Sequence, residues 1–546
     1  MRNTTLCYIE KDNKYLMLLR NKKENDCNEG KWIGIGGKFK KKENAEACLL
    51  REVREETGLT LTDYHFHGIV FFLNTKWEDE AMYLYTAAGF EGDINYDCPE
   101  GELHWVEKNE VMNLNLWEGD KLFLKKLIDG EERFSMTLSY DGDELLDAVE
   151  WCSHNGICGG CTYGGMTYEA QRKDKEEKLL KVLTPAFDEN TVWEGVLESP
   201  LHDRYKNKME YSFGDEVKGG PVTLGMHKHK CFYSVLTCDD CRIVSEDYNR
   251  IVKATELYFN LFRIPYVNRR SHEGYLRHLM IRKSFANGGL LIDLITADMP
   301  DAMCVMSENE LLNRWKDIIL KLDLDGYVAG ILHTRNNSLS DAIKDEGTEI
   351  IYGNDFIEEE LLGLTFKITP FSFFQTNSKG AEVLYGKVRE YVGDTTGQTV
   401  YDLYSGTGTI AQLVAPVAEK VYGVEIIGEA VEAARDNAKT NGLDNCEFIA
   451  GDVLEVIDAL EKKPDMIILD PPREGLHPKM LPKIAAYGVK NIVYVACRPA
   501  SFARDMEYFK TQGYRVVKAA GIDQFPYTKH VESVVLLSHI SGVPEK

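Results

Sequence analysis

From about residue 397 to the end of the chain, short β-type runs alternate regularly with helix-like segments. The runs are QTVYDLYS, KVYGVEI, CEFIAGD, DMIILD, NIVYVAC, YRVVKAAGI and VESVVLLSHI. Strands that are separated by helices usually pair in parallel, because each helix carries the chain back to the edge where the next strand begins. The alternation therefore predicts a doubly wound, mostly parallel α/β sheet in this part of the chain.

The chain has 546 residues, which is more than one usual domain of roughly 100 to 200 residues, so we expect two to four domains. Near its start, β-type runs surround a charged helix-like segment at 43–58, which predicts a small α+β unit. The segment DGDELLDAVEWCSHNGICGGCTYGG, rich in acids, Gly and Cys, then breaks the pattern. We divide the chain into residues 1–148, a loop and helix at 149–180, a mixed β-rich central domain at 181–370, and the α/β domain at 371–546.

Composition and charge narrow the function classes. Hydrophobic residues at 44% and charged residues at 28% are close to the globular average and argue against a disordered chain. There is no run of 18 apolar residues and no apolar stretch behind a basic start, so we expect a cytoplasmic protein without a membrane span. The net charge of −24 argues against loose, charge-driven binding to nucleic acid, but it leaves room for a specific RNA site.

The first chemical site lies in GKFKKKENAEACLLREVREETGL, residues 37–59. Glu52, Glu55 and Glu56 are spaced three and four apart, so their carboxylates project from one face of a helix. Like charges at this density favour a hard divalent cation such as Mg²⁺ or Mn²⁺. The alternative is a solvated acidic helix face, but glycines in the preceding loop, Arg51 within the acid cluster and Gly58 at the helix end argue against it.

At these residues the sequence matches the Nudix box at every fixed position, and residues 1–145 are most similar to Nudix hydrolases that act on 8-oxo-dGTP. The resemblance implies an α/β/α sandwich that hydrolyses a nucleoside triphosphate to the monophosphate and pyrophosphate with Mg²⁺ or Mn²⁺. The implied site residues are Glu52, Glu55, Glu56, the Gly37 carbonyl and Glu100 for the metal, and Lys23, Trp117 and Asp120 for the nucleotide. Two positions depart from the family: Ile33 stands where those enzymes carry an amide that reads the purine edge, and Gly119 replaces one of two adjacent base-reading acids.

A cysteine cluster follows the first domain. Cys152, Cys158 and Cys161 are close in sequence, and Cys238 and Cys241 lie far downstream, a spacing that can hold either a zinc ion or an iron-sulfur cluster. Three unrelated buried thiols are a poor alternative, because this Gly-rich polar loop offers no core to bury them. The segment is similar to the cluster loop of ribosomal RNA uracil-C5 methyltransferases, which implies a [4Fe-4S] cluster held by the first three cysteines and Cys241, with Cys238 as the competing fourth ligand.

The loop DLYSGTGT at 402–409 follows the first strand of the α/β domain and opens a helix. Its glycines let the backbone approach a ligand at the point where the strand order reverses, and Glu425, at the end of the second strand, can accept both hydroxyls of a ribose. A dinucleotide is the alternative ligand, but its site needs Gly-x-Gly-x-x-Gly and this loop reads Gly-x-Gly-x-x-Ala. We therefore predict an S-adenosylmethionine site and assign to it Asp402, Tyr404, Ser405, Gly406, Gly408, Glu425 and, for the adenine amine, Asp452.

Three further strand ends carry Asp470 in DPPREGL, Cys497 in VYVACRPAS and Glu532 in HVESV, and in this fold they should converge beside the cofactor. The C5 carbon of uracil takes a methyl group only after a thiolate has added to C6, and a base must then remove the C5 proton. We assign Cys497 as the nucleophile and Glu532 as the base, with Asp470 and Gln375 in SFFQTN binding the uracil or orienting the reacting groups. An enzyme that methylates the adenine amine would also fit Asp-Pro-Pro, but it needs no nucleophilic Cys.

Residues 152–546 resemble the uracil-C5 RNA methyltransferases almost end to end, on SFFQTN, DLYSGTGTI, DPPREGL and HVESV. Two departures are the Arg of Cys497-Arg498-Pro499, where the family has Asn, and the Nudix-like unit, which stands where many members carry a basic β-barrel. The resemblance implies a Rossmann-like class I methyltransferase domain, and the cluster loop favours 23S ribosomal RNA over transfer RNA. We expect a monomeric, bifunctional enzyme. The alternatives are a transfer RNA substrate, or a Nudix unit that is an idle docking or sensing module.

Overall fold

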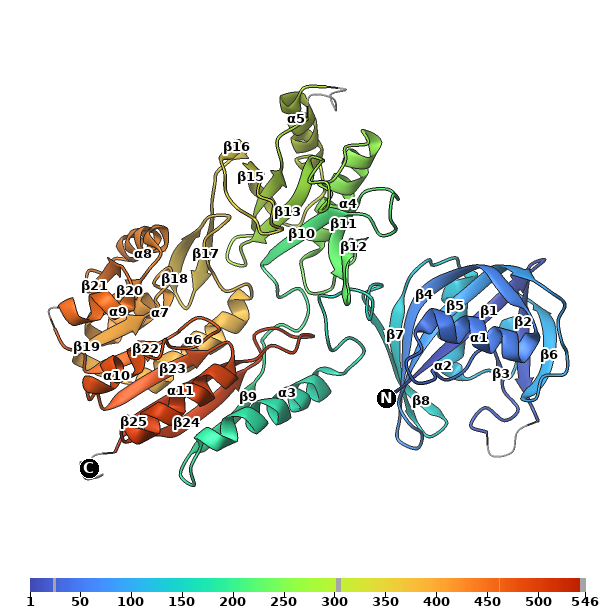
Figure 1. Ribbon diagram of the computed structural model, residues 1–546, viewed down its shortest axis with the longest axis horizontal. Helices are drawn as coiled ribbons and strands as arrows, with labels where there is room; N and C mark the ends of the chain where they lie inside the picture. The colour runs from blue at the N-terminus through green and yellow to red at the C-terminus, as the bar shows by residue number, and fades with distance from the viewer. Residues whose placement is uncertain (23–25, 301–305, 461, 541–546) are drawn as a thin grey trace. The chain divides into compact units, whose positions relative to one another are not determined.

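The computed structural model describes residues 1–22, 26–300, 306–460 and 462–540 (Figure 1). Contacts within the chain divide it into two compact units, Met1–Met166 and Thr167–Lys546. Across the described ranges, no helix combines the length and the apolar character that crossing a membrane requires.

One mixed sheet of eight strands runs through the first unit. Its spatial order is β3 (Trp32–Ile33), β2 (Lys14–Arg20), β1 (Arg2–Lys11), β5 (Glu80–Glu91), β4 (Thr60–Asn74), β7 (Ser135–Asp141) and β8 (Glu144–Trp151), and β6 (Gly101–Glu107) pairs with β2. The pairs β1–β5 and β4–β7 are parallel. The helices of the unit are α1 (Ala45–Thr57) and α2 (Glu118–Ile128), with a short 3₁₀ turn, η1 (Val111–Asn113), before α2.

Strand β1 shows how the sheet is covered on both faces. Successive side chains of a strand point to opposite faces. Cys7 and Ile9 belong to the core that includes Leu49 and Val53 of α1, whereas Leu6 and Tyr8 belong to the core that includes residues of α2. The first unit is therefore a sheet between two helices, the α/β/α sandwich that the sequence predicts.

The second unit contains a seven-stranded mixed sheet in its central part. The order is β12 (Cys231–Thr237), β11 (Thr223–Lys228), β10 (Lys208–Gly214), β13 (Leu276–Lys283), β14 (Gly289–Thr296), β15 (Tyr327–Arg335) and β16 (Thr348–Gly353). Among the described residues, the β14–β15 pair is parallel and the other pairs of this sheet are antiparallel. The helices here are α4 (Glu246–Leu261) and α5 (Glu308–Ile319), and the buried indole of Trp315 on α5 donates to Thr255 on α4 at 3.1 Å. A hairpin of β17 (Ile357–Leu361) and β18 (Leu364–Ile368) follows.

The strands expected from residue 397 onward form the third sheet. Its order is β21 (Cys446–Ala450), β20 (Ala418–Glu425), β19 (Thr395–Leu403), β22 (Met466–Leu469), β23 (Asn491–Ala496), β25 (Glu532–His539), β24 (Tyr514–Ile522) and β9 (Val192–Leu197). The pairs that involve β25 are antiparallel and the others are parallel. Strand β9 comes from residues 181–370 of the sequence division, and it extends this sheet at the edge beside β24.

Helices cover both faces of this third sheet, as a doubly wound arrangement requires. One core contains buried residues of α6 (Ser378–Val392), α7 (Thr409–Val414) and α8 (Gly428–Thr440). The other contains buried residues of α3 (Tyr168–Leu183), α10 (Met480–Ala486) and α11 (Pro499–Thr511). The short helix α9 (Val453–Val456) follows β21. The strand order reverses between β19 and β22, so the carboxyl ends of these two strands open the crevice where such sheets bind ligands.

Candidate active sites

Asp402 marks the start of the first site, near the end of β19. Its side chain is fully buried, and Oδ2 accepts a hydrogen bond from the backbone N–H of Ala411 at 2.9 Å. Its other oxygen, Oδ1, is buried and has no hydrogen-bond partner among the described residues. Burial raises the pKa of Asp402 well above its usual value, and the nearby charge of Asp470 adds to this. A buried carboxyl oxygen without a partner is typical of a site that a ligand completes.

The loop after Asp402 is held against the end of β20. The N–H groups of Tyr404 and Ser405 both donate to the Val424 carbonyl, at 2.9 and 3.0 Å. The Glu425 carboxylate accepts from the N–H of Gly406 at 3.0 Å and from that of Ile427 at 2.9 Å. The hydroxyl of Ser405 is buried and, within the described ranges, has no hydrogen-bond partner. These hydrogen bonds fix the loop against Glu425, and the Ser405 hydroxyl is left available for a ligand.

Positive φ angles explain why glycines occur in this loop. Gly406 and Gly408 have φ of 54° and 72°, in the region where residues with a Cβ are strained. A Cβ on Gly408 would also lie 2.5 Å from the ring of Phe448. Tyr404, with φ of 68°, adopts the same region without being glycine. Non-glycine residues in this region also occur in ordinary turns of the chain, such as that at Asn13, but they are enriched at functional sites.

Asp452 lies two residues beyond β21 and caps α9, because its side chain accepts from the N–H of Leu454 at 2.9 Å. Its carboxylate is exposed at this edge of the sheet. Burial raises the pKa of the Tyr404 phenol to about 12, and the charge of Asp452 adds to the effect. Asp452 therefore lies near Tyr404 of the glycine loop.

Asp470, Cys497 and Glu532 come together at the neighbouring strand ends. Asp470 directly follows β22, Cys497 directly follows β23, and Glu532 is the first residue of β25. Register places the last two side by side, because Ala496 pairs with Ser533 in the antiparallel ladder of β23 and β25. The three groups predicted as uracil ligand, nucleophile and base thus share one edge of the sheet.

Burial raises the pKa of all three groups, and neighbouring charges add to the shifts of Cys497 and Glu532. Burial raises the pKa of Glu532 to about 8, and the charge of Asp470 raises it further while Arg473 opposes the shift. Burial likewise raises the pKa of the Cys497 thiol, followed by the charges of Glu532 and Asp470. Burial alone raises the pKa of Asp470 to about 7. Burial in a low-polarity site thus moves the pKa of both acids from the usual range of carboxyl groups to near neutrality.

Tyr385 was not predicted as part of this site. It lies on α6, is buried, and forms a hydrogen bond with the side chain of Gln375. Burial raises the pKa of its phenol, and the charges of Asp470, Glu532 and Asp402 add to the shift. Tyr385 therefore lies near both Asp402, which was predicted for the cofactor, and Asp470 and Glu532, which were predicted for the uracil. It follows SFFQTN by eight positions within an ordinary amphipathic helix, and no motif marks it.

The second candidate site is built on α1, whose ends are well defined. The side chain of Asn44 accepts from the N–H of Ala47 at 2.8 Å and caps the start of the helix, and Gly58 ends it with φ of 76°. Between these ends, Glu52 and Glu56 face the glycine loop before the helix. The N–H of Gly36 donates to Glu56 at 3.2 Å. A Cβ on Gly37 would lie within 2.7 Å of all three atoms of the Glu52 carboxylate.

Arg51 is the main counter-charge of the acid cluster. Its guanidinium donates to Glu43 at 2.7 and 2.8 Å, to Glu52 at 2.5 Å and to Glu55 at 3.1 Å. These hydrogen bonds lower the pKa of Glu43 to about 2. Lys40 donates to the exposed Glu55 at 3.1 Å and, with Arg51, lowers the pKa of that carboxyl. Glu43 and Arg51 thus form an ion pair that fixes the helix against the loop.

Glu56 behaves differently from its neighbours. It is buried, and burial followed by the charge of Glu52 raises its pKa to about 8. The charge of Arg20 opposes this shift, and Arg20 is also bonded to Glu100 and, at 2.7 Å, to Asp26. Glu100 is therefore held near Glu56 through Arg20, a residue that no motif indicated. A buried, protonated carboxyl among acids is the situation that a divalent cation relieves.

The carbonyl of Gly37, one of the predicted metal ligands, has two contacts within the protein. It accepts from the N–H of Thr5 at 2.9 Å, and the Cys48 thiol lies 3.6 Å from it. The first contact holds the loop against β1, and the second holds it against α1. One lone pair of the carbonyl is therefore used in the backbone bond, and the weak thiol donor is the group that a cation would displace.

Trp117 and Asp120 lie together at the start of α2. The indole N–H of Trp117 donates to Asn28 at 2.8 Å, and the Lys31 ammonium lies 4.8 Å from the centre of its ring. Asp120 is buried, and burial raises its pKa to about 7, while the charge of Lys31 opposes the shift. Lys23, the third predicted nucleotide contact, lies outside the described residues.

The structure explains one departure from the family pattern. A Cβ on Gly119 would lie 2.5 Å from the hydroxyl oxygen of Tyr140 and 2.6 Å from Leu138. The same hydroxyl accepts a hydrogen bond from the Gly119 N–H at 2.8 Å. Tyr140 thus fills the space where a second acid would begin. Ile33, the other departure, is partly buried against the core beneath α1.

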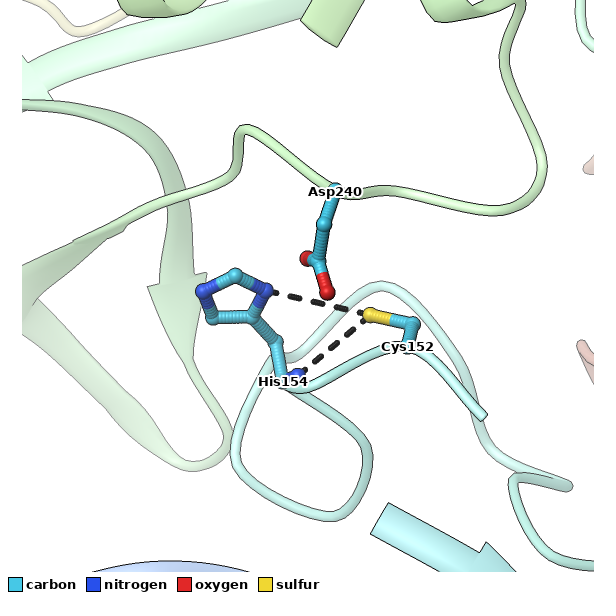
Figure 2. A group of neighbouring side chains, drawn as sticks. All are labelled: Cys152, His154 and Asp240. Atoms are coloured by element: carbon cyan, nitrogen blue, oxygen red, sulfur yellow. Dashed lines mark hydrogen bonds between the residues drawn. The ribbon is translucent and has the colours of Figure 1, made fainter. Parts of the chain in front are cut away.

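The cysteine loop is held by its own backbone. The N–H of His154 donates to the Cys152 sulfur at 3.4 Å, and Nδ1 of the same imidazole lies 3.8 Å from that sulfur. Both contacts are drawn as dashed lines in Figure 2. The N–H of Gly160 donates to the Cys158 sulfur at 3.3 Å. Cys161 also belongs to the first unit, whereas Cys238 and Cys241, like the Asp240 labelled in Figure 2, belong to the second. Backbone donors of this kind stabilise thiolates.

Comparison with known proteins bears on both sites. The family described as tRNA (Uracil-5-)-methyltransferase matches residues 313–540, and the NUDIX domain family matches residues 1–127. A protein of Clostridium tetani named as an uncharacterized RNA methyltransferase is 43% identical over 78% of this chain and 94% of its own length. One of Bacteroides thetaiotaomicron with the same name is 35% identical over 71% of this chain and 88% of its own. The solved structure of the tRNA (uracil-54, C5)-methyltransferase of Pyrococcus abyssi in complex with S-adenosyl-L-homocysteine is 26% identical, covers 72% of this chain and 88% of that one, and has a TM-score of 0.56.

Proposed function

The chain belongs to the uracil-5 RNA methyltransferase family and carries a Nudix domain at its N-terminus, and from this we propose that it methylates C5 of uridine in 23S ribosomal RNA and hydrolyses nucleoside triphosphates. The observation that carries the first activity is the convergence of Cys497, Glu532 and Asp470 at adjacent strand ends. The test is to map 5-methyluridine in ribosomal and transfer RNA from cells with and without the gene.

The groups around the glycine loop fit S-adenosylmethionine in a Rossmann-like domain. Glu425 would accept the ribose hydroxyls, and Asp452 would accept the adenine amine. The buried Ser405 hydroxyl and Asp402 Oδ1, which have no hydrogen-bond partner in the described part of the chain, would gain one. When bound, the cofactor supplies an electrophilic methyl group on its sulfonium. The loop residues Tyr404, Gly406 and Gly408 allow the backbone to approach it.

Cys497 and Glu532 would perform the two steps that uracil needs. The Cys497 thiolate adds to C6 and makes C5 nucleophilic, and Glu532 removes the C5 proton after methylation so that the thiolate leaves. Burial and the nearby Asp470 raise the pKa of Glu532 to about 8, which makes its carboxylate a stronger base than an exposed one. Asp470, Gln375 and Tyr385 would hydrogen-bond the uracil and orient it between the two groups.

The choice of ribosomal RNA rests on the cysteine loop. We assign a [4Fe-4S] cluster to Cys152, Cys158 and Cys161, and the backbone donors to Cys152 and Cys158 suit thiolate ligands. Cys241 as the fourth ligand, with Cys238 as its competitor, remains the prediction from the sequence. The solved relative that acts on uracil 54 of tRNA favours the alternative substrate, so the mapping must include both RNA classes.

The Nudix unit is proposed to be active. Glu52, Glu55 and Glu56 with the Gly37 carbonyl and Glu100 would hold Mg²⁺ or Mn²⁺, which neutralises phosphate and activates water. The supporting observation is the raised pKa of Glu56, because few counter-charges reach that buried carboxyl. Trp117 would stack on the base, and Asp120 would read its edge, with an oxidised purine as the expected base. A panel of oxidised and ordinary nucleoside triphosphates tests this, and no hydrolysis of any of them would favour a docking or sensing module.

A further inference from the structure

The β11–β12 hairpin is an exception in this acidic chain. Residues 217–238, VKGGPVTLGMHKHKCFYSVLTC, contain three lysines, two histidines and no Asp or Glu, although the whole chain carries a net charge of −24. Lys228 pairs with Cys231, so His229 and Lys230 form a two-residue turn, and Lys230 has φ of 59°. The basic residues are thus concentrated at the tip of a tight hairpin.

Two aromatic side chains follow this tip on β12, the edge strand of the central sheet. Phe232 is 72% exposed and Tyr233 is 70% exposed. Because they are neighbours on a strand, their rings extend on opposite faces of the sheet. The Arg270 guanidinium lies 5.5 Å from the centre of the Tyr233 ring. A single exposed aromatic residue is common, but two in sequence beside cations are typical of surfaces that stack nucleic acid bases.

A neighbouring loop fixes the hairpin and adds positive charge. Arg269 donates to the Phe232 carbonyl at 2.8 Å, and its other terminal nitrogen contacts His227 at 2.8 Å and Asp341 at 2.6 Å. The facing acids are Asp341 and, 3.2 Å from Lys228, Glu216. Lys230 and Arg270 stay exposed beside the two aromatic rings, so the surface keeps an excess of positive charge.

A small polar cavity lies beside this loop. Its volume is about 30 Å³, and its lining includes Arg269, Arg277, Ser212 and His278. His278 is 6% exposed, and its buried Nε2 has no hydrogen-bond partner in the part of the chain that the structure describes. The cavity is too small for a nucleobase, and Asp341, which pairs with Arg269, also lines it, so its lining carries charges of both signs.

We propose that the hairpin surface, defined as His227–Tyr233 with Arg269 and Arg270, binds an unpaired segment of the substrate RNA. Bases stack on Phe232 and Tyr233, and Lys230 and Arg270 contact phosphates. This inference rests on the proposed RNA methylation. The surface supplies the charge that the acidic chain as a whole lacks, and stacking on both faces of an edge strand requires bases that are not paired.

The test measures how tightly the full chain binds a fluorescent single-stranded RNA of about 20 nucleotides. Fluorescence anisotropy gives the affinity over a range of salt concentrations. Phe232→Ala and Tyr233→Ala should each weaken binding by about fivefold to a hundredfold. Arg270→Glu should lower the slope of log K against log salt by about 1. The matched controls are Tyr352→Ala, on the opposite edge strand β16, and Lys321→Glu on an exposed site, and both should bind as the wild type does.

Cross-linking gives an independent readout. RNA that carries 4-thiouridine should attach under near-ultraviolet light to the tryptic peptide 231–242, which contains both aromatic residues. Wild-type affinity in both aromatic variants, together with cross-links only outside this peptide, would overturn the proposal, and it is also the result expected if the surface docks a protein. If the wild type binds RNA through the surface but methylates neither RNA class, the proposed methylation fails and the surface stands.

Discussion

Cys497 and Glu532 occupy adjacent strand ends, but their loss should have different effects. Cys497→Ala should neither methylate RNA nor form a covalent complex with RNA that contains 5-fluorouridine, because no C6 adduct can form. Glu532→Gln should accumulate a denaturation-resistant complex on ordinary uridine, because the C5 proton cannot leave. A denaturing gel with labelled RNA shows whether each variant forms its covalent complex.

Cys446→Ala is the matched control for this prediction. Cys446 is also partly buried in the same sheet, but it begins β21 and so lies at the opposite end from the proposed site. It should form the covalent complex with 5-fluorouridine RNA as the wild type does. Turnover by Cys497→Ala near the wild-type rate would contradict the mechanism, and methylated cytosine or adenine would contradict the substrate class.

The ionisation of Cys497 should depend on Asp470. Burial, followed by the charges of Glu532 and Asp470, raises the pKa of the thiol, so alkylation of Cys497 should increase with pH above neutrality. Asp470→Asn removes one negative charge and should move the midpoint of alkylation to lower pH. Mass spectrometry of the tryptic peptide 491–504, which contains Cys497, measures the alkylated fraction at each pH. Asp458→Asn removes an equal charge from an exposed carboxylate and should leave the midpoint unchanged. An equal shift in the two variants would contradict a specific effect of Asp470 on Cys497.

Three of the four residues that the sequence predicted for this site lie at strand ends, and the fourth, Gln375, was assigned from the motif SFFQTN. Cys497, Asp470 and Glu532 follow from the rule that strand termini of a parallel sheet meet at one edge. Tyr385 and Arg20 could not be predicted in this way. Each lies within a regular element and reaches its site through tertiary packing, which leaves no local pattern in the sequence.

At the scale of elements, the junction of α2 with β7 explains the missing acid in the base-reading pair. Gly119→Asp should destabilise the first unit by about 1 to 3 kcal/mol, because its Cβ would overlap Tyr140 and Leu138. Leu122→Ala, an exposed change on the same helix, should cost less than about 0.5 kcal/mol. Chemical denaturation measures both. A stable Gly119→Asp variant with altered base preference would mean that Tyr140 moves aside.

Helix α3 joins the third sheet through a buried ion pair. Lys175 donates to Asp523 at 2.5 Å, and both side chains are fully buried. Lys175→Ala should lower the free energy of unfolding by about 3 to 5 kcal/mol, because it leaves Asp523 without its counter-charge. Replacing both residues, as Lys175→Met with Asp523→Leu, should cost much less. Equal losses in the single and double variants, measured by denaturant unfolding, would contradict this account.

The sequence predicted the elements of the third sheet better than its edges. Alternation of strands and helices from residue 397 fixes the parallel core, because hydrophobic periodicity is a local signal. Strand β9 was not foreseen, since its pairing of Val192 with Lys518 joins residues far apart in the chain. The charged helix α3, with Lys175 on its buried side, likewise reads as a solvated helix until its distant partner Asp523 is known.

At the scale of the whole molecule, the two proposed activities use residues of separate units, so they should be lost separately. Glu56→Gln should reduce Mg²⁺-dependent hydrolysis by about a hundredfold or more and leave RNA methylation unchanged. Cys497→Ala should do the reverse. Glu150→Gln, on exposed β8 of the first unit, is the control and should preserve both activities. Loss of methylation in Glu56→Gln would show that the two activities are coupled.

The pH dependence of metal binding distinguishes an active Nudix site from an acidic surface. Without metal, burial and Glu52 raise the pKa of Glu56 to about 8, so this carboxyl holds a proton at neutral pH and must release it to bind a cation. The affinity for Mg²⁺ should therefore increase as the pH rises from about 6 to 8, and one proton should be released on binding below pH 8. Calorimetry in buffers of different ionisation enthalpy measures this proton. Glu56→Gln should lose both the proton release and the pH dependence, whereas Glu118→Gln, an exposed acid on α2, should keep them. Affinity that does not vary with pH in the wild type would mean that the cation binds only the exposed Glu55, and the Nudix unit would then be better described as a docking module.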